Sequence, residues 1–117
     1  MKSFNYAATT HVLREVIAER EKQHAKWGEQ NHAAFCWLAI LHEESGEVAQ
    51  ACLHDVFGGK AQGTLRAELI QVAAVAVAFI ESLDRAKYAP PVAPTEILAL
   101  RHCSRFPANE RESAELA

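Results

Sequence analysis

The sequence predicts an all-α fold, in which three main helices and a short C-terminal element form a helical bundle that is completed by dimerisation. Apolar residues recur at helical intervals in three long stretches, and clusters of glycine or proline separate these stretches. The 117 residues suit a single domain, with its core at about residues 10–85 and a tail at residues 86–117. A short glycine-rich link favours antiparallel packing of the second and third helices.

The first helix is expected over about residues 10–27, and the second over about residues 33–56. In the first helix, the apolar positions with helical spacing include Val12, Leu13, Val16 and Ile17. Gly46 weakens the second helix slightly, but a glycine also lets a neighbouring segment approach closely. The link that follows contains Gly58, Gly59 and Gly63, which make it flexible.

The third helix is expected to begin after Thr64, a suitable N-cap, and to reach about Arg85. Valine and alanine alternate over residues 72–78 as they would in a strand, but the length of the stretch and its alanine content favour a helix. This helix is apolar on nearly every side between Leu69 and Ile80, which predicts burial all round. One small subunit can hardly cover it, so we expect a second copy related by two-fold symmetry. Three prolines in residues 88–94 end the helical core, and a short helix is expected at about residues 95–103.

Composition excludes several classes of protein. Lys and Arg number 12 and Asp and Glu 15, a formal charge of −3 that argues against binding to a nucleic-acid polymer. The three cysteines form no CxxC pair, so we expect small buried residues in place of a disulfide framework. The longest apolar run has nine residues, whereas a membrane span needs ~20. With no signal-like start either, a cytoplasmic protein with no membrane association is expected.

Two acidic clusters interrupt the apolar helical pattern. The first contains Glu43, Glu44 and Glu47, and the second pairs Glu68 with Gln71. Residues three apart on a helix share a face, so the members of each matched pair, Glu44 with Glu47 and Glu68 with Gln71, point the same way. Glu44 also lies on the apolar stripe of its helix, and a carboxylate that faces a core is costly unless it is paired or binds a metal.

A divalent cation explains these clusters better than a side-chain partner does. No Lys or Arg occurs between residues 30 and 59, so no cation lies close in sequence to the first cluster. Antiparallel packing of the two helices would bring the clusters together, and Mg²⁺ between them would remove their repulsion. Such an ion suits cleavage of phosphoanhydrides, with a spare carboxylate, such as Glu43, to orient or deprotonate water. Adjacent glutamates on a helix are more commonly solvated surface, but the matched spacing of the two clusters favours a metal site here.

The two clusters also carry a family resemblance. Glu43-Glu44-x-x-Glu47, followed about twenty residues later by Glu68-x-x-Gln71, resembles the EExxE…ExxD signature of MazG-like proteins, members of the all-α nucleoside triphosphate pyrophosphohydrolase superfamily. The segments LHEESGEVAQA and LRAELIQVAAVAVAFIESL carry most of the likeness. The segment AKWGEQNH resembles one from a branch of small bacterial and phage MazG-like proteins. The likeness covers roughly residues 10–85.

The resemblance implies hydrolysis between the α and β phosphates of a nucleotide, which yields a nucleoside monophosphate and pyrophosphate. It implies Mg²⁺, with Mn²⁺ as an alternative, a house-cleaning role in the nucleotide pool, and dimers or dimers of dimers with sites near the subunit interface. By position, Glu44, Glu47 and Glu68 match the metal ligands of the family, and Glu43 matches the first glutamate of its motif. Gln71 departs from the pattern, which has Asp there. Its amide oxygen can still coordinate Mg²⁺, but it carries no charge and should bind the ion more weakly.

Five further residues are expected to hold the nucleotide: Lys26, Trp27, Gln30, His32 and Arg66. Lys26 and Arg66 suit phosphates, and Trp27 is preferred as the residue that stacks on the base. Gln30 and His32 offer donors and acceptors to the edge of a base. Some of these residues also have an explanation that involves no nucleotide. A tryptophan can be a core residue, and a charged side chain can be an ordinary solvated surface residue. Asn31, beside them, is also a suitable helix N-cap.

Three functions follow from this reading. The first is a Mg²⁺-dependent nucleoside triphosphate pyrophosphohydrolase. The second is a catalytically weak or inactive MazG-like module that binds a nucleotide or a protein partner, and Gln71 motivates it. The third is hydrolysis of a related phosphoribosyl nucleotide, for which no feature of the chain selects. The identity of the substrate is not readable from residue spacing.

Overall fold

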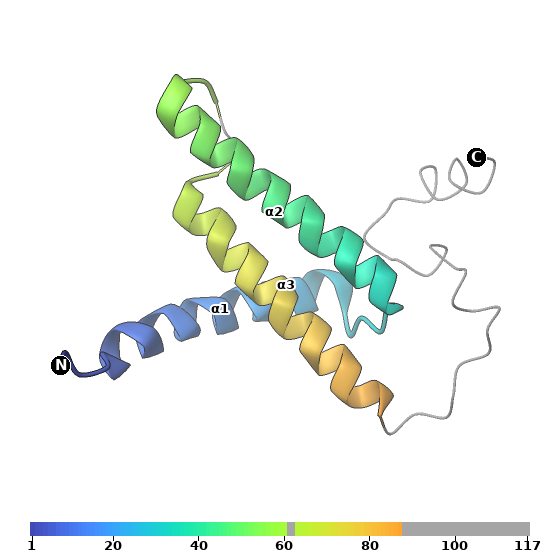
Figure 1. Cartoon of the computed structure of the whole chain (residues 1–117). Coiled ribbons are helices and arrows are strands. Elements are labelled where there is room, and N and C mark those ends of the chain that lie inside the picture. Colours follow the sequence, from blue (N-terminus) through green and yellow to red (C-terminus); the bar gives the residue numbers. More distant parts are fainter. Residues whose placement is uncertain (61–62, 88–117) are drawn as a thin grey trace, which may run out of the picture.

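A computed structural model describes residues 1–60 and 63–87, which form three helices and no strand. Helix α1 spans Tyr6–Trp27, α2 spans Ala34–Phe57 and α3 spans Leu65–Ala86 (Figure 1). An all-α fold is therefore confirmed for this part of the chain, and the three expected helices are present. The short helix expected at residues 95–103 and the rest of the tail lie outside the described residues.

The first turns of the helices show which caps the sequence predicted correctly. Oδ1 of Asn5 accepts a hydrogen bond from the backbone N–H of Ala8 at 3.0 Å, so α1 begins earlier than the expected residue 10. The hydroxyl of Thr64 accepts one from the N–H of Ala67 at 3.2 Å, which confirms Thr64 as the cap of α3. Asn31 was a candidate cap for the second helix, but no side chain caps α2.

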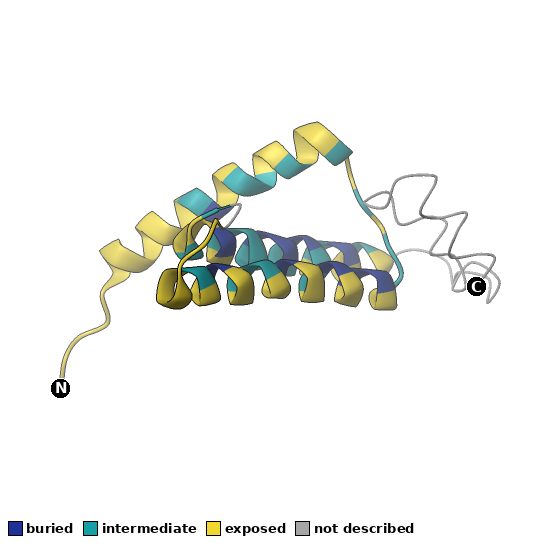
Figure 2. Cartoon of the chain, turned by 90° about the horizontal axis from the view of Figure 1, so that it is seen from above, coloured by how far each residue is buried: buried dark blue, intermediate teal, exposed yellow. Residues whose placement is uncertain are grey.

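The helices form two layers. α2 and α3 run antiparallel, side by side, and share the most extensive contact, as the short link between them predicts. α1 crosses one side of this pair and packs mainly against α3 (Figure 2). The first half of α1 extends past the pair, and residues 1–14 are all exposed. The α2–α3 seam therefore has one side that faces α1 and one that does not.

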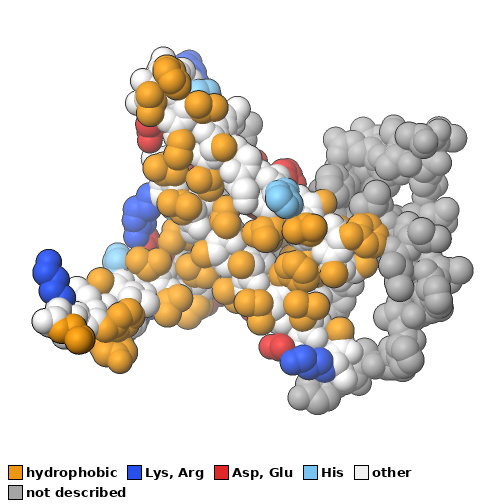
Figure 3. Space-filling model, in the orientation of Figure 1, with side chains coloured by type: hydrophobic (Ala, Val, Ile, Leu, Met, Phe, Trp, Pro, Cys, Tyr) orange, Lys and Arg blue, Asp and Glu red, His pale blue; other side chains and the backbone are white. Residues whose placement is uncertain are grey.

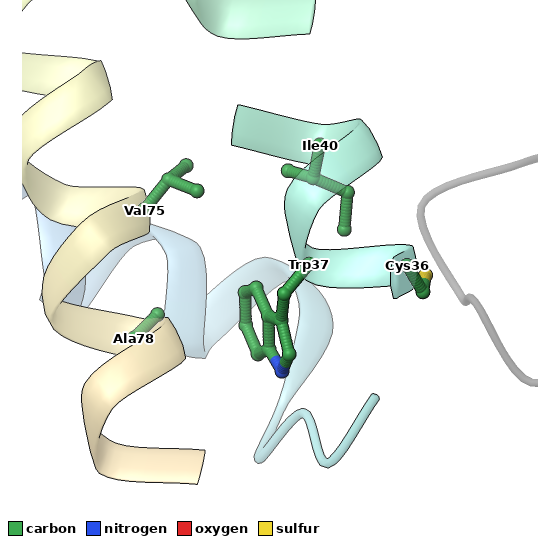
Figure 4. Packing of buried hydrophobic residues seen from close by; sticks show 5 residues of the cluster. All are labelled: Cys36, Trp37, Ile40, Val75 and Ala78. Atoms are coloured by element: carbon green, nitrogen blue, oxygen red, sulfur yellow. The ribbon is translucent and has the colours of Figure 1, made fainter. Parts of the chain in front are cut away.

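The core lies in the seam between α2 and α3. It contains Cys36, Trp37, Ile40, Val75 and Ala78 (Figure 4). Trp37 is only 2% exposed and its ring stacks on that of Phe79, with the centroids 5.8 Å apart. An aromatic side chain buried this far contributes heavily to stability, and its replacement by alanine is expected to cost about 3–5 kcal/mol. Trp37 is thus a core residue.

A network of charged side chains ties the end of α1 to the end of α3. Nη2 of Arg20 on α1 lies 3.1 Å from Oε2 of Glu81 on α3. Arg85 on α3 donates from Nη2 to the backbone oxygen of Gln30 at 3.0 Å and from Nε to Oδ1 of Asn31 at 2.7 Å. The network fixes the segment between α1 and α2, and it explains what Asn31 does in place of capping a helix.

Hydrophobic side chains gather over the face of α2 and α3 that is turned away from α1 (Figure 3). Leu69 is 50% exposed and Ile80 is 58% exposed, so the expected burial of α3 on all sides does not occur within one chain. The pattern of apolar residues described the helix correctly, but none of the described helices covers this face.

The cysteines differ from the expectation of three small buried residues. Cys36 is buried as expected, but it is disulfide-bonded. Cys52 is a free thiol and is exposed. The expectation of three small buried cysteines is therefore wrong for Cys52, and the disulfide of Cys36 was not expected. None of the helices described is long and apolar enough to cross a membrane.

Candidate metal centre

Three glutamates converge at the seam between α2 and α3. Glu44 and Glu47 come from α2 and Glu68 comes from α3, and one carboxylate oxygen of each lies within 4.8 Å of those of the other two. Glu44 is fully buried at 0% exposure and Glu68 is 6% exposed, while Glu47 is half-buried. The structure thus brings together the three residues predicted as charged metal ligands.

Local structure explains the convergence. Glu44 and Glu47 lie three residues apart in one helix, so their side chains leave the same face of α2. Glu68 stands in the first turn of α3, where the helix dipole favours a negative side chain. Antiparallel packing across the short link then sets this turn beside the middle of α2.

The electrostatics of the cluster favour a cation. Burial raises the pKa of Glu68 above its ordinary value, and the negative charge of Glu47 and a hydrogen bond with it raise the pKa further. Oε2 of Glu68 is buried and receives no hydrogen bond from the residues described. Oxygen donors that repel one another in a dry place are the ligand set that a hard divalent cation prefers. The residues therefore fit Mg²⁺ or Mn²⁺.

A cleft beside α1, which we call the α1 cleft, consists of two sections, and both are lined by Gln71, which lies one helical turn from Glu68. The first, of about 370 Å³, is lined by Glu19, Lys22, Gln23, Lys26, Trp27, Glu43 and Gln71. The second, of about 470 Å³, is lined by Glu15, Ala18, Glu19, Lys22, Thr64, Arg66, Ala67, Ile70 and Gln71. Glu19, Lys22 and Gln71 line both, so the two sections lie next to each other.

The α1 cleft collects several of the predicted site residues. Glu43 is exposed and lines this cleft, so it lies apart from the three converging carboxylates. Nζ of Lys26 lies 4.6 Å from the centroid of the Trp27 ring, which places both at the end of α1. Gln71, a predicted ligand, lines the cleft one helical turn from Glu68.

Arg66 also lines the cleft, but Glu15 holds it. Nη1 of Arg66 donates to Oε1 of Glu15 at 2.9 Å, and Nη2 donates to the second oxygen. Arg66 lowers the pKa of Glu15 chiefly through this hydrogen bond, and Glu15 raises the pKa of Arg66 in return. A phosphate would have to compete with Glu15 for this guanidinium.

Two predicted nucleotide contacts lie elsewhere. Gln30 lines a separate cavity, to which α1 contributes Arg20 and His24 instead of Lys26 and Trp27. His32 packs edge-on against Trp37, with the ring centroids 4.8 Å apart. The structure therefore does not bring Gln30 and His32 into the α1 cleft with Lys26 and Trp27, although the sequence places all four in one segment.

Sequence reasoning predicted Lys26 and Trp27 as site residues but missed the other residues of α1 that line the cleft. Glu15, Glu19, Lys22 and Lys26 are spaced by four, three and four residues, so they form one polar stripe along the helix. That spacing is readable from the sequence. It did not stand out because exposed polar stripes are common on surface helices.

No protein-family model, curated protein or solved structure matches this chain. The function therefore has to be argued from the residues themselves. Among the residues described, the features that carry it are the three converging carboxylates and the polar cleft beside them.

Proposed function

We propose that the protein is a Mg²⁺-dependent nucleoside triphosphate pyrophosphohydrolase of the MazG-like kind, with a house-cleaning role in the nucleotide pool. It would cleave the bond between the α and β phosphates and release a nucleoside monophosphate and pyrophosphate. The single observation that carries the proposal is the convergence of Glu44, Glu47 and Glu68 from two helices. Three ionised carboxylates coexist in so buried a place only if a cation offsets their repulsion.

The roles of the acidic residues follow from their places. Glu44, Glu47 and Glu68 would hold the ion, and Gln71 offers an amide oxygen at the side that faces the α1 cleft. The chemistry that Mg²⁺ or Mn²⁺ supplies when bound is neutralisation of phosphate charge and a lowered pKa of water. Glu43 lies in the cleft beside this group, where a carboxylate can orient or deprotonate the attacking water.

The α1 cleft suits the phosphates of the substrate. Lys22 and Lys26 bring positive charge to its first section, and Arg66 brings it to the second. A triphosphate lying along the cleft would pass beside Gln71, the residue shared by both sections and one turn from Glu68. These cations would hold the β and γ phosphates, which leave together as pyrophosphate.

We infer that the active form is a homodimer, or a dimer of dimers. The support is the apolar face of α2 and α3 that α1 leaves uncovered, together with the exposure of Leu69 and Ile80 on α3. An exposed apolar surface of this kind marks an interaction site more often than it remains in contact with water. No nucleic-acid polymer or membrane is included among the proposed partners.

Pyrophosphate release from standard and modified nucleoside triphosphates tests the proposal. Glu47→Gln and Glu68→Gln keep the shape of each side chain and remove one charge, so both variants should lose activity about a hundredfold or more while remaining helical by circular dichroism. Asp55→Asn is the matched control, because it removes one charge from an exposed position on α2. Full activity of either glutamine variant at limiting Mg²⁺ would rule out this metal centre.

A second function, a catalytically weak or inactive module that binds a nucleotide, is favoured by Gln71 alone. The structure gives this side chain a place in the α1 cleft, but it supplies one charge fewer than aspartate would. Tight nucleotide binding by calorimetry, with no pyrophosphate released in Mg²⁺ or Mn²⁺, would support this second function. Gln71→Asp should then raise metal affinity and restore turnover.

A further inference from the structure

A small polar cavity lies where α1, α3 and the segment between α1 and α2 meet, and we call it the Trp37 cavity. Its volume is about 160 Å³, and it is more enclosed than the α1 cleft. The lining residues are Arg20, His24, Gly28, Glu29, Gln30, Trp37, Ala78, Glu81 and Arg85. Neither the metal centre nor the α1 cleft uses this cavity.

A buried hydrogen-bond donor borders the cavity. Nε1 of Trp37 is inaccessible to water and has no acceptor among the described residues. Figure 4 shows this nitrogen on the edge of the ring that is turned away from Ile40 and Val75. The rings of Phe79 and His32 pack against the indole and fix its orientation. A buried donor without an acceptor is costly, so a ligand that brings an acceptor here gains affinity.

The charged groups of the cavity are already satisfied by one another. Both nitrogens Nε and Nη2 of Arg20 face the carboxylate of Glu81, at 3.4 and 3.1 Å. Arg85 has its own partners in Gln30, Asn31 and Glu29. With two guanidinium groups matched by two carboxylates, the cavity does not require an anion. The missing partner is therefore a neutral group that accepts a hydrogen bond.

The size of the cavity limits the ligand to one ring. A cavity of about 150 Å³ is known to hold benzene, so one of about 160 Å³ takes a single six-membered ring and not the fused pair of a purine. Trp37 supplies a donor at the edge of that ring. A planar six-membered ring with a carbonyl acceptor is the chemistry of a pyrimidine base.

The helices place the cavity at a suitable distance from the metal centre. From Trp37, seven residues along α2 lead to Glu44, and from Ala78, seven residues back along α3 lead to Gln71. Because α2 and α3 are antiparallel, both steps run the same way and both amount to about 10 Å. The base and the phosphates of an extended nucleotide are separated by a similar distance.

We propose that the Trp37 cavity takes the base of the nucleotide, that this base is a pyrimidine, and that Trp37 Nε1 donates to one of its carbonyl oxygens. The identification of the ligand as a nucleotide rests on the proposed function. The site places the base against Trp37 instead of Trp27, and it gives Gln30 and Arg85 a role at the wall of the base site.

Nucleosides, which have no phosphate, test the cavity without metal or catalysis. Ligand-observed NMR titrations in EDTA would give dissociation constants for uridine, cytidine, adenosine and guanosine on the full chain. Uridine and cytidine should bind at least about tenfold more tightly than adenosine and guanosine. Trp37→Phe keeps an aromatic ring but removes the N–H, and should weaken pyrimidine binding about tenfold.

A second variant fills the cavity. Ala78 is buried at its wall, so Ala78→Leu should abolish pyrimidine binding. Ala86→Leu is the matched control, since it adds the same side chain at an exposed position on α3. Thermal unfolding of each variant shows whether it is folded. If Ala78→Leu does not fold, the test of pyrimidine binding rests on Trp37→Phe.

Three outcomes would overturn the proposal. The first is that purine nucleosides bind as tightly as pyrimidine nucleosides. The second is that pyrimidine nucleosides still bind to both Ala78→Leu and Trp37→Phe. The third is that Trp27→Phe abolishes binding, which would place the base at Trp27. An absence of nucleoside binding, in a protein that releases pyrophosphate, would show that the cavity holds only water. Saturable pyrimidine binding without pyrophosphate release would overturn the proposed function and leave the base site standing.

Discussion

Gly63 leaves the space that the carboxylate of Glu68 occupies. A Cβ atom at residue 63 would overlap Oε1 of Glu68, the carboxylate that α3 contributes to the metal centre. Glycine is needed at residue 63 because it has no Cβ, and the side chain of Glu68 fills the space that a Cβ would take. Gly63, in the link between α2 and α3, therefore also borders the metal centre.

We predict that Gly63→Ala weakens metal binding without unfolding the protein. The added methyl group must push the Glu68 carboxylate away from Glu44 and Glu47, and the end of a glutamate side chain moves easily, so the cost falls on the geometry of the site. Mn²⁺ affinity, measured by calorimetry or electron paramagnetic resonance, should fall about tenfold or more.

Gly46→Ala is the matched control for this experiment. A Cβ at residue 46 meets no atom of the described residues within 4 Å, and the position is inside α2. The alanine should raise the stability of the helix by roughly 0.5–1 kcal/mol and leave Mn²⁺ affinity unchanged. Equal Mn²⁺ affinities for Gly63→Ala and wild type would show that the carboxylate of Glu68 does not need the space beside Gly63.

The stability of the metal-free protein should fall as pH rises, because of Glu68. The folded state raises the pKa of this carboxyl, so between its unfolded and folded pKa values the folded chain binds more protons than the unfolded chain. The free energy of unfolding then decreases as pH rises from the ordinary glutamate pKa of roughly 4.3, and stays lower above the folded pKa. Glu15 has the opposite sign, since its pKa is lowered.

Urea unfolding in EDTA from pH 4.5 to 7.5 would separate these contributions. Glu68→Gln cannot ionise, so its stability relative to wild type should increase with pH, while Glu15 contributes equally to both proteins. Added Mg²⁺ at pH 7.5 should stabilise wild type and have little effect on the variant. If the difference in the free energy of unfolding between the two proteins stays constant with pH, then the folded state does not raise the pKa of Glu68.

Helical periodicity predicted most of the fold, and motif spacing predicted the centre of the site. The pairs Glu44–Glu47 and Glu68–Gln71 show which helical faces are acidic. The short link between α2 and α3 favours antiparallel packing of these helices. Spacing within a helix is a local property, so it survives folding unchanged.

The parts that were missed depend on how separate helices cross. The angle of α1 over the seam decides that Lys22 and Glu19 face Gln71, and that Gln30 lines a different cavity from Lys26. Side-chain packing sets this angle, and no short motif records it. The disulfide of Cys36 is also missed, because residue spacing does not show which cysteines meet in space.

Glu15 should compete with the substrate for Arg66. Glu15→Gln removes the carboxylate that holds this guanidinium, so Arg66 becomes free to bind a phosphate, and KM for the nucleotide should fall about two- to fivefold. Arg66→Met should raise KM. Because the pair is exposed on the surface, neither variant should alter stability much.

Steady-state kinetics at two salt concentrations would check this competition. The difference in KM between Glu15→Gln and wild type should shrink at high salt, since an exposed ion pair is screened. His11→Gln is a control on the same helix, because His11 also lies near Glu15, at 3.8 Å, but does not line the cleft. A KM that is unchanged in both Glu15→Gln and Arg66→Met would place the phosphates elsewhere.

The apolar face of α2 and α3 should hold two subunits together. Leu69 and Ile80 are exposed in the single chain although they lie on a helix rich in apolar residues, so a charge at either position would be buried in a dimer without a partner. Leu69→Lys and Ile80→Lys should therefore convert the dimer to monomer in sedimentation equilibrium. Ala86→Lys places the same charge at the exposed end of α3 and should leave the mass of the dimer unchanged.

If wild type sediments as a monomer at every concentration, or if both Leu69→Lys and Ile80→Lys remain dimeric, this face does not form the dimer interface. Retained pyrophosphate release by monomeric Leu69→Lys would show that each site is complete within one chain.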